Sequence, residues 1–419
     1  MSRLLNVNSY HYRRGGSDVV YLEHAALMER AGWQVGYFSM QHPKNLPTPW
    51  SRHFVDELEF GHDYGLLQKL AMAGKVVHSF EAQRRLRGLL AEFPAQVAHL
   101  HCIYHHLSPS ILGTLQAAGV KVVLTAHDLK IACPAYKMLN AGGICERCRD
   151  GSVLNVVRQR CIRGSLGASA IVAVESGVQR WLGSYRRHVD RIVVPSRFFL
   201  EKFVQWGWPR ERFVHIPNYV DSSAFAPDFT PGDHVLYFGR LAPEKGVATL
   251  IDAAARAGVP LRIAGTGPEE AALRALAQRS GGRVEFLGFC AGQALHDAVR
   301  SARAVVLPSE WYENAPMSVL ESMALGKPVV GADIGGIPEL IAAGDTGWLF
   351  PSGDAPALAD TLRQVMGLPD TTLAAMGRAA RAHVTTHYNQ PAYLQAMLAL
   401  YASLGVPLPT ATQAPATTP

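Results

Sequence analysis

The sequence lacks any uninterrupted apolar stretch long enough to span a bilayer. Its start, Met1 to Asn6, also lacks the long apolar segment of a secretory signal peptide. Charged residues make up 18% of the chain and hydrophobic residues 48%, which is typical of a soluble globular protein with enough apolar material for large cores. We therefore expect a cytoplasmic location.

Acidic residues are scarce in the front half. Residues 1–217 carry 27 Lys and Arg against 16 Asp and Glu, whereas residues 218–419 carry 13 against 18. The two halves thus have formal charges of +11 and −5. A basic front half can meet an anionic membrane surface or an anionic acceptor, although scattered solvated arginines explain the count as well. Because no base-reading module is recognisable, we expect no nucleic-acid partner.

Cysteine is also scarce, yet four of the six cysteines fall between residues 133 and 161. Cys145 and Cys148 form a Cys-x-x-Cys pair flanked by Cys133 and Cys161, a number and spacing that fit a structural zinc site of four thiolates. Disulfides are not favoured in a cytosolic chain. The alternative is four unlinked thiols in a loop, because one half of the set lacks close pairing.

A chain of 419 residues exceeds a single core and predicts two or three domains. Short apolar runs alternate with helical segments throughout, which predicts two doubly wound α/β domains with parallel sheets and a boundary near residue 218. We expect strands at 3–8, 34–39, 97–102, 120–126, 191–195, 235–238, 261–264, 284–287 and 304–307, and long helices at 66–93 and 166–185.

The most informative stretch runs from Pro308 to Gly326. It follows a buried strand, and Pro316 and Gly326 predict a helix between them. Glu313 in the loop and Glu321 in the helix would face the crevice at the carboxyl end of the strand, where open parallel sheets bind ligands. The helix amino terminus suits a diphosphate, and ionised carboxylates suit sugar and ribose hydroxyls. Two solvated surface charges are the alternative.

Two loops resemble this one in placement. Gly15-Gly16 precedes a helix for which Ser17 or Asp18 is the expected N-cap, and the glycines let backbone approach a ligand. Arg240 and Lys245 lie in a glycine-bounded loop after the strand at 235–238, where cations can neutralise a diphosphate.

Histidines cluster near two strand ends. His127-Asp128 follows the strand at 120–126, where chemistry in such sheets is usually found. His99 and His101 share one face of the preceding strand, but the histidines around them lack a ligand grouping, so we interpret them as pocket-lining or buried imidazoles.

Together these residues resemble retaining glycosyltransferases of family 4, a GT-B group. The resemblance covers residues 4 to about 404. It is most specific in Gly239-Arg240 with Lys245-Gly246, and in Glu313 and Glu321 followed by Ser322 to Gly326. Weaker matches in the same order are Gly15-Gly16, His127-Asp128, Asn218 with Val220-Asp221, and Gly335 to Glu339.

The resemblance implies a role for each matching position. Arg240 and Lys245 would bind the donor diphosphate and stabilise the leaving nucleotide. Glu313 would contact the donor sugar, Glu321 the ribose, and His127 the reaction centre, with Asp128 orienting its imidazole. The implied catalytic residues are His127, Arg240, Lys245 and Glu313, and the implied donor-binding residues are Gly15, Gly16, Gly239, Phe289, Asn314, Ala315, Pro316, Met317, Ser318 and Glu321.

The resemblance further implies transfer of a sugar, with retention, from a UDP- or GDP-sugar to a hydroxyl of a glycan or lipid-linked acceptor in bacterial surface polysaccharide synthesis. No catalytic metal or other cofactor is implied, and no Asp-x-Asp pair argues otherwise. The enzyme would work in the cytoplasm, peripherally at the inner membrane face. Two alternatives are an inactive sugar-nucleotide-binding or scaffold protein and a nucleotide-sugar 2-epimerase, which would not need all four donor residues.

The implied domains follow the same pattern. An acceptor-binding domain would span residues 1–217, with the Cys-bearing insert at 133–161 shaping acceptor choice. A donor-binding domain would span 218–384, and a C-terminal helix within 385–406 would return to the first domain. Residues 407–419, rich in Pro, Thr and Ala, would form a disordered tail.

Overall fold

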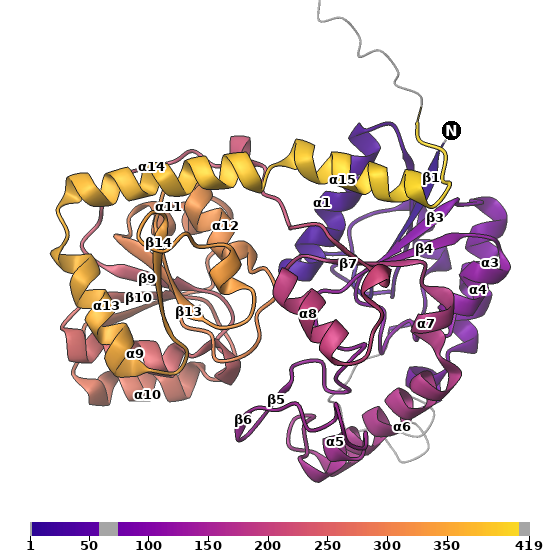
Figure 1. Ribbon diagram of the computed structural model, residues 1–419, viewed down its shortest axis with the longest axis horizontal. Coiled ribbons are helices and arrows are strands. Elements are labelled where there is room, and N and C mark those ends of the chain that lie inside the picture. The colour runs from indigo at the N-terminus through magenta and orange to yellow at the C-terminus, as the bar shows by residue number, and fades with distance from the viewer. Residues whose placement is uncertain (1, 58–73, 410–419) are drawn as a thin grey trace, which may run out of the picture. The chain divides into compact units, whose positions relative to one another are not determined.

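The computed structural model describes residues 2–57 and 74–409 (Figure 1). The chain divides into two compact units. The first contains Met1–Pro195, Leu200–Ile216 and Leu394–Pro419, and the second contains Ser196–Phe199 and Pro217–Tyr393. Each unit has its own sheet, as two doubly wound domains require.

The first unit is built on a parallel sheet of six strands in the order β2-β1-β3-β4-β7-β8. Leu5 at the centre of β1 pairs with Gly36 on one side and Ala98 on the other, and the inner strands are buried apolar runs. The strands are β1 (Arg3–Val7), β2 (Gln34–Phe38), β3 (Val97–Leu100), β4 (Lys121–Thr125), β7 (Arg191–Val194) and β8 (Phe213–His215).

Helices connect these strands in two directions. From β1 the chain crosses through α1 to β2, and all later crossovers run the opposite way along the sheet, so right-handed crossovers place α1 on one face and the later helices on the other. The helices are α1 (Gly16–Arg30), α3 (Phe80–Glu92), α4 (Ile111–Ala117), α7 (Ser184–His188) and 3₁₀ turns at Pro49–His53 and Arg210–Arg212. The greater part of α8 (Arg197–Gln205) and of α15 (Gln390–Ser403) also belongs to this unit.

The second unit repeats this plan with the strand order β11-β10-β9-β12-β13-β14. Its core contains Leu250, Val306 and Leu320, all fully or almost fully buried. The strands are β9 (Val235–Phe238), β10 (Leu261–Ala264), β11 (Val284–Gly288), β12 (Ala304–Leu307), β13 (Val329–Asp333) and β14 (Gly347–Pro351).

The helices of the second unit cover its sheet in two groups, in which α13 packs on α9 and α14 packs on α12. The helices are α9 (Val247–Ala257), α10 (Glu270–Ser280), α11 (Gly292–Arg300), α12 (Met317–Ala324), α13 (Ala355–Gly367), α14 (Asp370–His387) and 3₁₀ turns at Ser222–Ala224, Pro243–Lys245 and Ile337–Glu339. The predicted α/β fold class is therefore confirmed.

The Cys-bearing insert lies between β4 and α6 in the first unit. It contains the short hairpin β5 (Leu139–Asn140) and β6 (Gly143–Ile144), then α5 (Asn155–Arg158). The chain leaves it through α6 (Leu166–Leu182), which packs on α5.

Three local predictions are wrong. The N-cap of α1 is Gly15, and neither Ser17 nor Asp18 caps it, because Asp18 already lies in the first turn. The predicted helix at 166–185 breaks at Gly183, whose φ of 63° ends α6 and starts α7. The predicted helix at 66–93 is also interrupted, since Ser79 caps a new helix by accepting a hydrogen bond from Ala82 N–H.

Parts of two predictions lie outside the described residues, namely helix residues 66–73 and tail residues 410–419. Within 2–57 and 74–409, no helix has the length and apolar character needed to cross a membrane.

Candidate active site

In each sheet the chain reverses direction at one pair of neighbouring strands. In the second unit this pair is β9 and β12, and the loops after both strands meet at their carboxyl ends. A Cβ on Gly246 would stand 1.9 Å from the Pro308 carbonyl oxygen, so the two loops touch and no larger residue fits at Gly246. This edge is where open α/β sheets bind ligands.

Lys245 and Glu313 join the two loops through an ion pair, with Nζ 2.7 Å from Oε1. Ser309 donates a second hydrogen bond to the same carboxylate oxygen, also at 2.7 Å. Burial raises the pKa of Glu313, but the Lys245 ammonium and the hydrogen bonds from Ser309 and Trp311 outweigh it, so the pKa lies below its ordinary value. The buried carboxylate is thus ionised at neutral pH.

Arg240 differs from Lys245 in exposure. Its side chain is 61% exposed and lies 3.3 Å from the buried carboxylate of Glu244. The Tyr237 hydroxyl donates to the Arg240 carbonyl at 2.9 Å, which fixes the backbone of the loop after β9. The guanidinium can therefore reach a bound anion while its loop stays in place.

The remaining predicted donor residues of this unit surround the start of α12. Pro316 is the N-cap, Met317 and Ser318 form the first turn, and Glu321 is half-buried one turn later. The helix amino terminus carries backbone N–H groups and the positive end of the dipole. Gly239 follows β9, and Phe289, after β11, has a side chain that is 76% exposed. In the loop before α12, the Asn314 side-chain oxygen accepts a hydrogen bond from Ser196 Oγ. The Ala315 carbonyl accepts one from Asn218 Nδ2.

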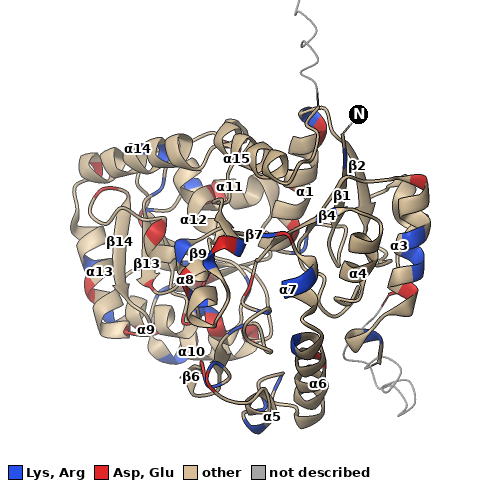
Figure 2. Ribbon diagram, turned by 45° about the vertical axis from the view of Figure 1, so that its right-hand side comes forward, with Lys and Arg blue, Asp and Glu red and all other residues tan. Residues whose placement is uncertain are grey.

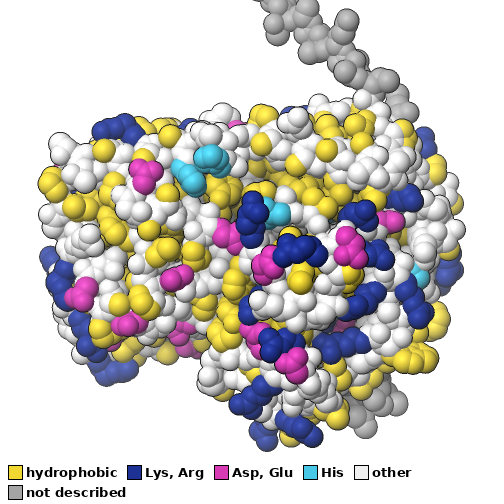
Figure 3. Space-filling view, in the orientation of Figure 1, with side chains coloured by type: hydrophobic (Ala, Val, Ile, Leu, Met, Phe, Trp, Pro, Cys, Tyr) yellow, Lys and Arg dark blue, Asp and Glu magenta, His cyan; other side chains and the backbone are white. Residues whose placement is uncertain are grey.

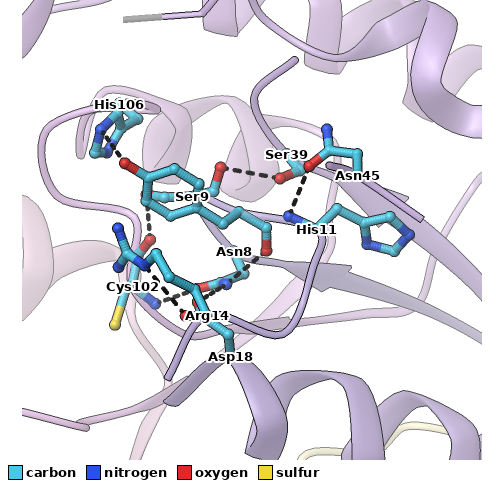
Figure 4. A network of polar contacts seen from close by, with 10 residues as sticks. Asn8, Ser9, His11, Arg14, Asp18, Ser39, Asn45, Cys102 and His106 are labelled. Atoms are coloured by element: carbon cyan, nitrogen blue, oxygen red, sulfur yellow. Dashed lines mark hydrogen bonds and ion pairs between the residues drawn. The ribbon is translucent and has the colours of Figure 1, made fainter. Parts of the chain in front are cut away.

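In the first unit the chain reverses between β1 and β3, and the glycine loop follows β1. Gly15 and Gly16 are exposed at the start of α1. Asn8 holds the loop: its Nδ2 donates to Asp18 Oδ1 at 2.9 Å, and its Oδ1 accepts from Cys102 N–H after β3 (Figure 4). These buried hydrogen bonds of Asn8 thus hold the loop that carries the exposed glycine backbone.

His127 lies at the end of a chain of imidazoles. Its Nε2 is 2.7 Å from Nδ1 of His101, whose ring stacks on His99 at 5.0 Å between centroids. His99 in turn contacts Thr125 Oγ1 and the Tyr401 hydroxyl, both at 2.6 Å. Burial lowers the pKa of His127 to about 4, so the ring is neutral at pH 7. This arrangement agrees with the interpretation of His99 and His101 as buried imidazoles.

Asp128 does not orient His127. Its Oδ1 accepts from Lys130 N–H at 2.9 Å, and burial raises its pKa to about 6. The residue in contact with the His127 ring is instead His101. Sequence reasoning missed His101, Asn8 and Ser309 as supporting residues, and only their positions after adjacent strands could have indicated them.

The four cysteines of the insert are unoxidised, and electrostatic interactions between their thiols place them in one neighbourhood. Burial raises the pKa of Cys133 and of Cys161 to about 11, which opposes the thiolate form that a metal needs. Among the residues that the structure describes, no group of three His, Cys, Asp or Glu side chains could hold a metal ion. The present arrangement does not fit zinc, and a structural zinc stays a prediction from spacing.

Comparison of the chain with protein-family profiles identifies the family that these loops suggest. The profile Glycosyltransferase Family 4 matches residues 14–224, half of the chain, and the profile Glycosyl transferases group 1 matches residues 227–383. The chain belongs to glycosyltransferase family 4.

Curated relatives in this family act in glycolipid and polysaccharide synthesis. The chain is 29% identical over 239 residues to a GDP-mannose-dependent monoacylated phosphatidylinositol monomannoside mannosyltransferase of Corynebacterium glutamicum. It is 32% identical over 219 residues to the amylovoran biosynthesis glycosyltransferase AmsK of Erwinia amylovora. The first match covers 51% of this chain and 62% of the relative, and the second covers 48% and 53%. The chain thus spans little more than half of the length of these relatives.

Solved structures confirm the GT-B fold. Sucrose-phosphate synthase of Thermosynechococcus elongatus has a TM-score of 0.71 at 21% identity and covers 97% of this chain and 99% of its own. Anabaena HepE, solved with UDP, has a TM-score of 0.65 at 21% identity and covers 96% and 100%. At this identity the likeness shows the fold alone.

Proposed function

We propose that this protein transfers a sugar from a UDP- or GDP-sugar to a hydroxyl of a glycan or lipid-linked acceptor, with retention at the anomeric carbon. The observation that carries the proposal is the Lys245–Glu313 ion pair beside the exposed Arg240 at the point of strand reversal in the second unit. The HepE complex with UDP and the GDP-mannose-dependent relative support the two nucleotide classes.

Two cations would bind the donor diphosphate. Arg240 can contact phosphate oxygens directly, and Lys245 can share its protons between Glu313 and a phosphate oxygen, since an ammonium has three donors. The start of α12 would add backbone N–H groups and its dipole. These groups stabilise the negative charge that builds up on the nucleotide as it leaves.

The reaction itself exchanges one bond for another. The bond between the anomeric carbon and the donor phosphate oxygen breaks, and the acceptor hydroxyl forms the new bond on the same face of the sugar. The leaving phosphate oxygen takes the hydroxyl proton, so no enzyme nucleophile and no metal is needed in this scheme. Glu313, held by Lys245 and Ser309, would accept hydrogen bonds from the donor sugar, and neutral His127 would line the reaction centre.

A transfer assay tests the proposal. The protein is incubated with radiolabelled UDP-glucose or GDP-mannose and bacterial lipid-linked glycans, and the anomeric configuration of the product is read by NMR. We expect label in the acceptor fraction with the α-configuration of the donor. A β-linked product would contradict retention, and label transfer that is unchanged in Glu313→Gln would contradict the assigned site.

The first unit has a surface suited to an anionic membrane. Leu166, Val174 and Trp181 are exposed along α6, and the exposed Leu154, which precedes α5, lies near Val174. Lys and Arg residues occur on α3, α5 and α7 (Figure 2), and Lys and Arg side chains are frequent, among some Asp and Glu, on the face of this unit shown in Figure 3. Exposed apolar and aromatic side chains next to arginines are typical of proteins that bind at membrane interfaces. We propose peripheral binding at the inner membrane face as the route to a lipid-linked acceptor.

Vesicle sedimentation tests this membrane surface. The protein is expected to pellet with vesicles containing phosphatidylglycerol at low salt and to be released at high salt. Trp181→Ser should weaken binding, whereas Trp348→Phe, in the core of the second unit, should not. Equal partition onto neutral and anionic vesicles, or none onto either, would contradict this part of the proposal.

A further inference from the structure

The first unit contains a cavity of about 260 Å³. It lies between the Cys-bearing insert, the carboxyl end of α6, α7 and the segment after α8. Its lining includes Lys130, Glu175, Arg180, Arg186, Trp206 and Trp208. None of the residues assigned to donor binding or catalysis lines it, so it needs a separate explanation.

The cavity has an excess of positive charge. Lys130 and Glu175 neutralise each other, because Nζ lies 2.6 Å from Oε2 and both side chains are 2% exposed. Arg149, also in the lining, pairs with the carboxylates of Asp150 and Glu146.

Arg180 and Arg186 supply the excess. Arg180 donates to the Ala132 carbonyl and Arg186 to the Gly207 carbonyl at 2.7 Å. Within residues 2–57 and 74–409, neither guanidinium forms an ion pair with a carboxylate. Partial burial lowers the pKa of Arg180, and the nearby Cys148 and Cys133 thiols act in the opposite direction. Arg180 and Arg186 both keep exposed surface. Both guanidinium groups are therefore accessible to a bound anion.

The other walls are aromatic. Trp208 lies under the Arg186 guanidinium at 4.7 Å, and Trp206 contributes a second indole. Tyr185 also lines the cavity, and its buried hydroxyl has no hydrogen-bond partner within the described chain. Flat aromatic walls with a few polar groups are typical of sites for small ring-shaped ligands.

We propose that this cavity binds a saccharide that carries an oxyanion, either the carboxylate of a uronic acid or a phosphate. Arg180 and Arg186 would contact the anion through their planar forks, which match carboxylate and phosphate oxygens, and the indoles would contact the sugar ring. A neutral sugar would leave both guanidinium groups without a counter-charge. The proposal concerns binding alone and does not require that the protein transfers sugar.

NMR titration of the full chain tests the proposal. The indole N–H signals of Trp206 and Trp208, assigned with Trp→Phe variants, report on the cavity. The probes are glucuronate, glucose 6-phosphate, glucose and inorganic phosphate. We expect glucuronate or glucose 6-phosphate to shift these signals at a concentration about tenfold lower than glucose needs, and the stronger of the two identifies the oxyanion. Equal effects of glucose, or a response to inorganic phosphate alone, would overturn the proposal.

Variants on α7 give a matched comparison. Arg186→Gln should weaken binding about tenfold, Arg186→Lys should weaken it less, and Arg187→Gln, which lies outside the lining, should leave it unchanged. Equal weakening by Arg186→Gln and Arg187→Gln would reject the site. Nucleotide binding in the same samples shows that each variant is folded, and failure of nucleotide binding in the wild type would count against the proposed function and not against the cavity.

Discussion

Lys245 and Glu313 are 68 positions apart in the sequence, yet their side chains form an ion pair of 2.7 Å. The loops after β9 and β12 bring them together at the reversal point of the second sheet. The two partners differ in burial, since the Lys245 side chain is 23% exposed and that of Glu313 is 8% exposed. Removing the Lys245 charge should therefore lower the stability of the protein more than removing the Glu313 charge.

Lys245→Met should destabilise the protein more than Glu313→Gln. The first variant leaves a buried carboxylate without its cation, a loss of roughly 3–5 kcal/mol, whereas the second leaves a partly exposed ammonium, a loss of roughly 1–3 kcal/mol. Urea unfolding at pH 7.5 measures both. The penalty of Lys245→Met should shrink as the pH falls toward 5, because the unpaired carboxyl then takes up a proton. An equal loss of stability in Lys245→Met at pH 7.5 and at pH 5 would contradict this interpretation of the ion pair.

His101 should act as a positioning residue for His127. His101→Leu removes the 2.7 Å contact to His127 Nε2 and should lower kcat by roughly tenfold to a hundredfold. His101→Asn keeps a polar atom close to the position of Nδ1 and should recover much of the rate. A merely structural role for His101 would lower stability equally in both variants without separating their kcat values.

Buried histidines make the first unit sensitive to acid. Burial lowers the pKa of His11, His106 and His127 to about 4 and that of His24 to about 3. The unfolded chain therefore binds more protons between pH 6.5 and 4. The stabilisation is complete above pH 6.5 and is lost as the pH falls. Asp128, with its pKa raised to about 6, acts in the opposite direction over part of this range.

These five groups contribute a net uptake of about three protons on unfolding near pH 5, or roughly 4 kcal/mol per pH unit. His99, His101 and His105, whose pKa values burial holds well below the ordinary value, act in the same direction as the four histidines. Urea midpoints at pH 7.5, 6.5, 5.5 and 4.5 measure the slope. His24→Gln should reduce it by about one proton. A stability that stays constant between pH 7 and 5 would show that these imidazoles are not held in the neutral form.

The Lys130–Glu175 pair should behave as a coupled unit. Lys130→Met or Glu175→Leu alone should each cost roughly 3–5 kcal/mol, because the remaining charge stays buried. The double variant Lys130→Met with Glu175→Leu should cost clearly less than the sum. Additive losses in a double-mutant cycle would indicate that the two groups act separately.

The fold was predictable because its signals are local. The strands Val235–Phe238, Leu261–Ala264 and Ala304–Leu307 agree with the prediction to the residue, since each is a short apolar run bounded by Gly or Pro. The break of the predicted helix 66–93 at Ser79 is not evident from the sequence, because the helical pattern continues through the residue that caps α3. Family membership followed from motif order, which is also local information.

The side-chain contacts within the site were not predictable from the sequence. The contact of His99 with Tyr401 joins residues 302 positions apart, and no sequence period encodes such a pair. Adjacency in sequence points to Asp128 as the partner of His127, whereas the residue adjacent in space is His101. Likewise, the contacts of Glu313 with Lys245 and Ser309 depend on how the loops after β9 and β12 meet.

The central claim is that the exposed Arg240 and the paired Lys245 bind a nucleotide-sugar diphosphate. Calorimetric titration of UDP-glucose and GDP-mannose into the wild type, Arg240→Gln and Arg256→Gln tests it most directly. Arg240 and Arg256 are both more than half exposed, but Arg256 lies in the last turn of α9, away from the loop after β9. We predict binding of one nucleotide class that Arg240→Gln weakens at least about tenfold and Arg256→Gln leaves unchanged. Binding that is equal in all three proteins, or absent from the folded wild type, would contradict the account.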